Sequence, residues 1–170
     1  MSSDTANKLS ERLGYLLLNN KLKIATAESC TGGGLSEIIT RIPGSSQWFD
    51  RGFVTYSNAA KESMLKVATE ILQTFGAVSE ETAQAMAAGA LSASEADLVV
   101  SITGIAGPDG GSDEKPVGTV CFAWAMQDRT LQSTRVLLHG NRNEIRHQAC
   151  LMALQGAIEL LEKHQDSSKK

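Results

Sequence analysis

Short apolar runs alternate with amphipathic segments along the first sixty residues of the chain. Residues 9–17 carry leucines at helical spacing, and residues 22–27 (LKIATA) are typical of a short strand. After three glycines, residues 35–42 return to helical spacing, and Pro43-Gly44 ends that segment. Residues 52–57 (GFVTYS) predict a second strand. Strands separated in this way by helices favour parallel pairing through crossover connections.

Three helices are predicted between this second strand and the next apolar run. Asn58 is expected to cap a short helix, a further small helix ends at Gly76, and Ser79 is expected to cap a longer one. The longer helix presents a face of small residues suited to close packing on a sheet. A last helix is predicted from about residue 143 to residue 163, and we expect a disordered tail after it, at about 164–170.

The late strands decide the fold class. Residues 97–103 (DLVVSIT) indicate a buried strand, while residues 117–126 and 131–138 flank a polar turn and predict an antiparallel hairpin. The hairpin requires at least one antiparallel neighbour beside the parallel strands. We therefore predict an α/β protein, a three-layer α/β/α sandwich with a mixed, mostly parallel sheet of about five strands, formed by a single domain over residues 1–170.

Composition excludes several classes of function. The net charge is −3 and aromatic residues make up 5% of the chain, so we expect no nucleic-acid partner. No apolar run reaches the ~18 residues that span a bilayer, and the first residues do not form a secretory signal. We therefore expect no membrane association and a cytoplasmic location. Three widely spaced cysteines without a CxxC pair indicate neither a disulfide framework nor a metal site.

The stretch TAESCTGG, from Thr26 to Gly33, lies where the first strand hands over to a helix. Small-molecule sites in α/β proteins gather at such junctions. Ser29 is either a nucleophile beside free backbone N–H groups or, together with Thr31, an ordinary helix cap. Cys30 is a rival nucleophile, but adjacent side chains normally point in opposite directions, so only one of the two faces a site.

A nucleophilic serine needs a base, and two kinds of residue are available. The three histidines are His139, His147 and His164, and no local signal brings any of them to Ser29. Lys61 stands near the start of a predicted helix, where the helix dipole disfavours its charge by only ~0.3–1 kcal/mol. Burial or a neighbouring cation would have to lower the pKa of Lys61 further for it to act as a base. A surface lysine is the alternative.

Two further features suit a phosphorylated ligand. The loop TGIAGPDGG, residues 103–111, is rich in backbone amides and can form an anion-binding nest, although it matches neither a dinucleotide-binding nor a Walker motif. Arg142 and Arg146 flank the start of the last helix, where they either hold a phosphate or pair with Glu144. Tyr56, at the end of the second strand, is either a helper of the base or a half-buried strand residue.

Together, long ordered blocks of this sequence resemble the C-terminal domain of the CinA competence-damage-inducible proteins. The blocks are TAESCTGG, GSSQWFDRGFVTYSNAAK, GAVSEETAQAMA, ITGIAGPDGGSDEKPVGTV and HGNRNEIR, and they extend over about residues 9–161. The resemblance implies an α/β/α sandwich whose stand-alone members hydrolyse the carboxamide of nicotinamide mononucleotide to nicotinate mononucleotide and ammonia, in pyridine nucleotide recycling. It implies no metal and no cofactor.

The resemblance also implies roles for particular residues. Ser29 becomes the nucleophile, Lys61 the base and Tyr56 an assisting residue. Substrate contacts are implied for seven further residues: Thr31, Gly32, Gly33, Thr103, Gly104, Gly107 and Arg142. Of these, the backbone amides near Gly32 and Gly33 would hold the oxyanion, and Arg142 would hold the phosphate. The family often has Asp where this chain has Asn141, so the resemblance does not define the role of that corner.

Two alternatives to an enzyme stay open on the sequence. A non-catalytic nucleotide-binding or regulatory module would use the same loops without turnover, and a DNA-related accessory role is disfavoured by the acidic composition. The expected partner is the small-molecule substrate, and the helix faces allow a homodimer.

Overall fold

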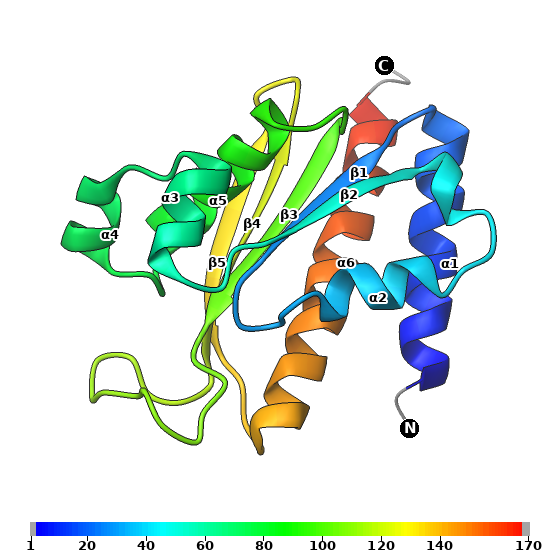
Figure 1. The fold of residues 1–170 in the computed structure, drawn as a ribbon. Coiled ribbons are helices and arrows are strands. Elements are labelled where there is room, and N and C mark those ends of the chain that lie inside the picture. Colours follow the sequence, from blue (N-terminus) through cyan, green and yellow to red (C-terminus); the bar gives the residue numbers. More distant parts are fainter. Residues whose placement is uncertain (1–2, 168–170) are drawn as a thin grey trace.

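A computed structural model of the chain describes residues 3–167, and its helices and strands form three layers (Figure 1). The elements follow in the order α1 (Ser3–Asn20), β1 (Ile24–Glu28), α2 (Gly34–Thr40), η1 (Ser45–Gln47), β2 (Phe49–Val54), α3 (Asn58–Leu65), α4 (Thr69–Phe75), α5 (Glu80–Ser92), β3 (Leu98–Gly104), β4 (Thr119–Met126), β5 (Leu131–Leu137) and α6 (Arg142–Ser167).

The sheet has five strands in the order β2-β1-β3-β4-β5. β1 runs parallel to both of its neighbours, β2 and β3, whereas β4 pairs antiparallel with β3 and with β5. β4 alone therefore runs against the other four strands. The prediction of a mixed, mostly parallel five-stranded sheet is confirmed, and the predicted hairpin supplies the reversed strand.

Helices cover both faces of the sheet, and the two faces carry different side chains (Figure 1). The face under α1, α2 and α6 receives the bulky residues of the central strands, such as Ile102 and Phe122. The face under α5 receives small residues, such as Ala25 and Ala123, which pack on the small-residue side of that helix. Because successive strand residues point to opposite faces, the two apolar layers alternate along each central strand.

Three boundaries differ from the predictions. Ser57, not Asn58, caps α3, because its hydroxyl accepts the Ala60 N–H at 3.0 Å. The second strand begins earlier, at Phe49, and α2 ends earlier, at Thr40 rather than at residue 42.

The last helix is also longer than predicted. Residues 164–167 are helical rather than disordered, while residues 168–170 lie outside the described part of the chain. Just before this end of α6, the exposed side chains of Arg12 in α1 and Glu162 form an ion pair at 2.8 Å.

Candidate active site

The predicted site lies at the carboxyl ends of the three parallel strands. Ser29 follows β1 directly, Gly104 ends β3, and the chain leaving β2 leads into α3, which carries Lys61. Backbone hydrogen bonds hold this corner to the neighbouring strands, since Ser29 N–H donates to Ile102 and Thr55 N–H donates to Glu28. Parallel topology therefore gathers residues that are far apart in the sequence at one edge of the sheet.

The central contact of the site joins Lys61 and Ser29. Nζ of Lys61 lies 2.9 Å from Oγ of Ser29, 2.8 Å from the Thr55 carbonyl oxygen and 3.3 Å from that of Tyr56. Lys61 is only 1% exposed, so the alternative of a surface lysine is wrong. No carboxylate forms a salt bridge with this amine among residues 3–167.

Burial lowers the pKa of Lys61, because the charged amine loses its hydration without gaining a carboxylate partner. In the structure the Lys61 amine donates to Ser29 Oγ and to the two carbonyl oxygens. A neutral amine has two N–H groups and one lone pair, so at the same distances it can keep the two carbonyl contacts and accept the Ser29 hydroxyl hydrogen instead.

Ser29 is not the cap of α2. That role belongs to Glu28, whose buried carboxylate accepts Leu35 N–H at 2.8 Å, Ser36 N–H at 3.0 Å and the Ser36 hydroxyl at 2.7 Å. These bonds satisfy the N–H groups at the start of the helix. The Ser29 hydroxyl is therefore left to Lys61, with a longer contact of 3.4 Å to the Tyr56 carbonyl.

The surroundings of Cys30 do not favour it as the nucleophile. Its side chain is buried in the apolar layer under α6, and burial raises the pKa of its thiol to about 11. A thiol with such a pKa contains very little thiolate near neutral pH. Arg146 fixes the same corner from α6, because its guanidinium donates to the carbonyl oxygens of Cys30 and Thr31, each at 3.1 Å.

Tyr56 contributes its backbone and its side chain to different parts of the site. Its carbonyl oxygen accepts a hydrogen bond from Lys61, while the residue as a whole is 58% exposed. The phenolic oxygen accepts a hydrogen bond from Arg142 at 2.9 Å, and the same guanidinium donates to the Gly107 carbonyl at 2.8 Å. The hydroxyl of Tyr56 thus belongs to the rim with Arg142, apart from the contacts of Lys61.

A cavity of about 260 Å³ opens above the Ser29–Lys61 pair. Its walls come from the β1 corner, the α4–α5 connection, the glycine-rich loop and the start of α6. The lining residues are Ser29, Cys30, Tyr56, Lys61, Ala77, Val78, Thr103, Gly104, Ile105, Ala106, Gly107, Asp109, Gly110 and Arg142.

The glycine-rich loop is shaped by close packing on the strand that follows it. A Cβ atom on Gly104 would lie 2.8 Å from a Val120 methyl and 2.9 Å from the Thr119 carbonyl oxygen. Gly107 has φ +78°, a conformation that side chains disfavour. Thr103 is anchored by its hydroxyl, which donates to the Ala77 carbonyl at 2.7 Å. All three predicted residues of this loop line the cavity.

Three other predicted contacts do not line the cavity: Thr31, Gly32 and Gly33. Thr31 is buried, and the Gly32 N–H already donates to the Ser29 carbonyl at 3.0 Å. The interpretation of Gly32 as an oxyanion donor is therefore not supported. These residues form the tight turn into α2, in which Gly32 and Gly33 have φ of +59° and +95°.

The family model for the CinA C-terminal domain matches residues 6–161. This chain belongs to the CinA C-terminal domain family. It is similar to the nicotinamide-nucleotide amidohydrolase PncC of Escherichia coli K12, with 52% identity over 91% of this chain and 94% of the relative. The PncC protein of Pseudomonas putida is 48% identical over 92% of this chain and 98% of its own length.

A solved structure of a CinA-family protein has the same fold. The competence/damage inducible protein CihA from Agrobacterium tumefaciens superposes with a TM-score of 0.90 at 46% identity, over 92% of this chain and 95% of that chain. The expected α/β/α architecture is thus shown by the sheet order and by an independent structure.

Asn141 caps the start of α6. Its side-chain oxygen accepts the N–H groups of Asn143 and Glu144 at 3.0 and 3.1 Å, and the Glu144 carboxylate accepts the Asn141 N–H at 2.7 Å. This reciprocal capping box starts α6 at Arg142. Asp and Asn are comparable caps, so Asn in place of Asp keeps the helix start.

Several site residues escaped the sequence-based predictions. Glu28 stood within the quoted stretch beside Ser29, and its acidic side chain just before a helix start was the available signal. Ala77 and Val78 carry no such signal, because they reach the cavity only through packing. Asp109 lay inside the glycine-rich loop, where its carboxylate was not assigned a role.

None of the three histidines, His139, His147 and His164, lines the cavity. No group of three or more His, Cys, Asp or Glu side chains gathers to hold a metal ion within residues 3–167. Among the described helices, none is sufficiently long and apolar to cross a membrane.

Proposed function

We propose that this protein hydrolyses the carboxamide of nicotinamide mononucleotide, giving nicotinate mononucleotide and ammonia, with Ser29 as the nucleophile and Lys61 as its base. The observation that carries the proposal is the 2.9 Å contact between these two side chains in a buried site. Relatives of about half identity over nearly their whole length are named nicotinamide-nucleotide amidohydrolases. The reaction would serve pyridine nucleotide recycling without a cofactor.

The first half of the reaction is acyl transfer to the serine. The Ser29 proton passes to the Lys61 amine as Oγ attacks the carboxamide carbon, which forms a tetrahedral intermediate. The C–N bond then breaks, and the leaving nitrogen takes the proton back from Lys61 to depart as ammonia. The product left on the enzyme is a nicotinoyl ester of Ser29.

The second half returns the enzyme to its starting state. Water donates a proton to neutral Lys61 while its oxygen attacks the ester carbon. Collapse of this second intermediate breaks the bond to Ser29 Oγ, which recovers the proton from Lys61, and nicotinate mononucleotide leaves. One carboxamide and one water give one carboxylic acid and one ammonia.

Arg142 is our candidate for the phosphate of the nucleotide. Its guanidinium lies at the rim of the cavity, and two of its N–H groups are oriented by Tyr56 and Gly107. The remaining donors are available in a fixed planar group, which suits phosphate oxygens. Thr103, Gly104 and Gly107 would contact the nucleotide from the facing wall.

The test is ammonia release from nicotinamide mononucleotide by the wild type and by Ser29→Ala, with chelator present. Turnover by the wild type and its loss in the variant are expected. Lys61→Arg keeps the charge but cannot act as a base at neutral pH, so it should lose about 10²–10⁴ in kcat. A wild-type enzyme that binds the nucleotide without releasing ammonia would favour the non-catalytic binding module.

The cellular setting is part of the same proposal. We place the protein in the cytoplasm, where it binds the nucleotide and binds neither nucleic acid nor a membrane. Homodimer formation stays a prediction, which light scattering of the purified protein measures directly.

A further inference from the structure

The cavity holds two opposite charges that do not pair with each other. Asp109 is the only carboxylate among its lining residues, and Arg142 is its exposed cation. The Arg142 guanidinium donates to Tyr56 and Gly107, and no salt bridge joins it to Asp109 in the described part of the chain. Asp109 therefore does not serve to neutralise Arg142.

The position of Asp109 is set by the loop around it. Its near neighbour Gly107 is tied to Arg142 by the 2.8 Å hydrogen bond, and Gly110, which follows it, has φ +94°. Within residues 3–167, the Asp109 carboxylate makes no ion pair with the protein. Asp109 is exposed, so its carboxylate is hydrated and accessible to a cationic group of a ligand in the cavity.

We propose that Asp109 is a specificity-determining residue that recognises the positive charge of the pyridinium ring. This inference rests on the proposed function, because nicotinamide mononucleotide carries both a cationic ring and an anionic phosphate. The cavity offers matching groups: a buried Ser29–Lys61 pair for the carboxamide, a carboxylate for the ring and a guanidinium for the phosphate.

The reduced nucleotide, with a dihydropyridine ring, lacks the ring charge. It keeps the carboxamide, the ribose and the phosphate, but its ring is neutral and no longer aromatic, so the effect of Asp109 is taken from the variant and the wild type with the same nucleotide. A partly screened charge pair near 4 Å corresponds to about fivefold in affinity. Asp109 should therefore make the oxidised nucleotide bind about fivefold more tightly than the reduced one, and added salt should diminish this preference.

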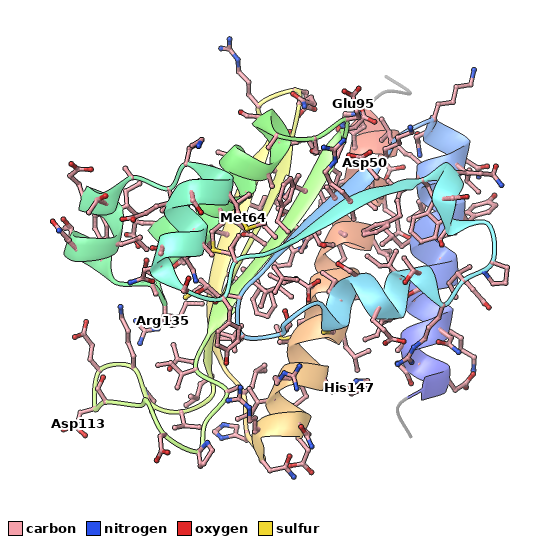
Figure 2. The ribbon with its side chains drawn as sticks, viewed as in Figure 1. Asp50, Met64, Glu95, Asp113, Arg135 and His147 are labelled. Atoms are coloured by element: carbon pink, nitrogen blue, oxygen red, sulfur yellow. The ribbon has the colours of Figure 1, made fainter. Side chains whose placement is uncertain are left out.

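The experiment measures the dissociation constants of both nucleotides by calorimetry on the Ser29→Ala protein, which binds without turnover. Asp109→Asn, added to this background, should weaken the oxidised nucleotide about fivefold and leave the reduced one unchanged. Asp113→Asn is the matched control. It removes the same charge from the same β3–β4 connection, but Asp113 lies outside the cavity lining, at the far end of that connection (Figure 2).

Two outcomes would overturn the inference. Equal weakening of both nucleotides by Asp109→Asn would assign the carboxylate to the ribose hydroxyls instead of the ring. An unchanged affinity for both would leave Asp109 with no part in recognition. Failure of the proposed function is a separate result, since it appears as absence of ammonia release by the wild type, whereas these affinities require no turnover.

Discussion

The hydroxyl of Tyr56 accepts a hydrogen bond from Arg142 at 2.9 Å, while the carbonyl oxygen of the same residue lies 3.3 Å from the Lys61 amine. Tyr56 thus connects the buried pair to the rim through its backbone, and its phenol lies on the side of the cavity that we assign to the phosphate. The resemblance to the CinA family had suggested an assisting role for this tyrosine. The geometry favours assistance in positioning rather than in proton transfer.

Removal of the Tyr56 hydroxyl tests this distinction. In Tyr56→Phe the carbonyl contact with Lys61 persists, but Arg142 loses one of its two partners. We expect KM for nicotinamide mononucleotide to rise by about 3- to 10-fold, the equivalent of one modest hydrogen bond, with kcat nearly unchanged. Steady-state kinetics separates the two parameters. A hundredfold fall in kcat would instead make the phenol a proton carrier.

Activity should fall towards acidic pH. Burial lowers the pKa of Lys61, and only its neutral amine can accept the Ser29 proton. As the pH decreases through this lowered pKa, the amine becomes protonated and kcat/KM should decline with the slope of a single proton. The residual activity of Lys61→Arg should not show this decline at acidic pH. A flat profile in the wild type would contradict the role of Lys61 as the base.

Stability should depend on pH through the same group. The unfolded chain holds a proton on Lys61 up to the ordinary value of 10.5, whereas burial lowers the pKa in the folded protein. Between the two values the unfolded state binds more protons, so the free energy of unfolding rises with pH across this window. Below the lowered pKa, Lys61 is charged in both states, and the folded protein bears the full cost of burying the charged amine.

Lys61→Met provides the comparison for this linkage. The variant has no titrating group at this position, so its stability should gain less than that of the wild type between neutral and mildly alkaline pH. Urea denaturation of both proteins at the two pH values measures the difference. Parallel gains in the two proteins would show that Lys61 titrates normally in the folded state.

Glu28→Gln should destabilise the fold by about 1–3 kcal/mol. The carboxylate accepts three hydrogen bonds at the start of α2, and an amide nitrogen in place of one oxygen would face N–H or O–H donors. Urea denaturation measures the effect. Glu37→Gln, within α2 itself, is the control, since it breaks only the exposed pair with Arg41 and should change stability by less than about 1 kcal/mol. Equal losses in both variants would refute the capping role.

Iodoacetamide should leave the enzyme active near neutral pH. Cys30 adjoins Ser29, but its thiol is buried and has a pKa of about 11, so thiolate is scarce. Ammonia release after treatment, together with mass spectrometry of the alkylated sites, measures the outcome. Cys30→Ala should likewise keep its turnover. Rapid inactivation accompanied by alkylation of Cys30 would reopen its candidacy as the nucleophile.

Local patterns were sufficient for the layered fold and for the corner that carries Ser29. Apolar periodicity, glycine and proline act over a few residues, so they predicted the strands, the hairpin and the junction after β1 without knowledge of distant contacts. The same local signals misplaced the cap of α3 by one residue, since Ser57 and Asn58 are both good caps. They also left Ser29 undecided between a cap and a nucleophile.

Tertiary structure removed the capping alternative for Ser29, because the groups that decide it are remote from Ser29 in the sequence or in the direction of their side chains. Lys61 becomes a candidate base only when α3 packs against α5, which buries the amine and brings it to a serine 32 residues away. Glu28 takes over the cap of α2 and leaves the Ser29 hydroxyl to Lys61. Solvent exclusion and the distance between side chains arise from the assembled layers, and no short stretch of sequence encodes either one.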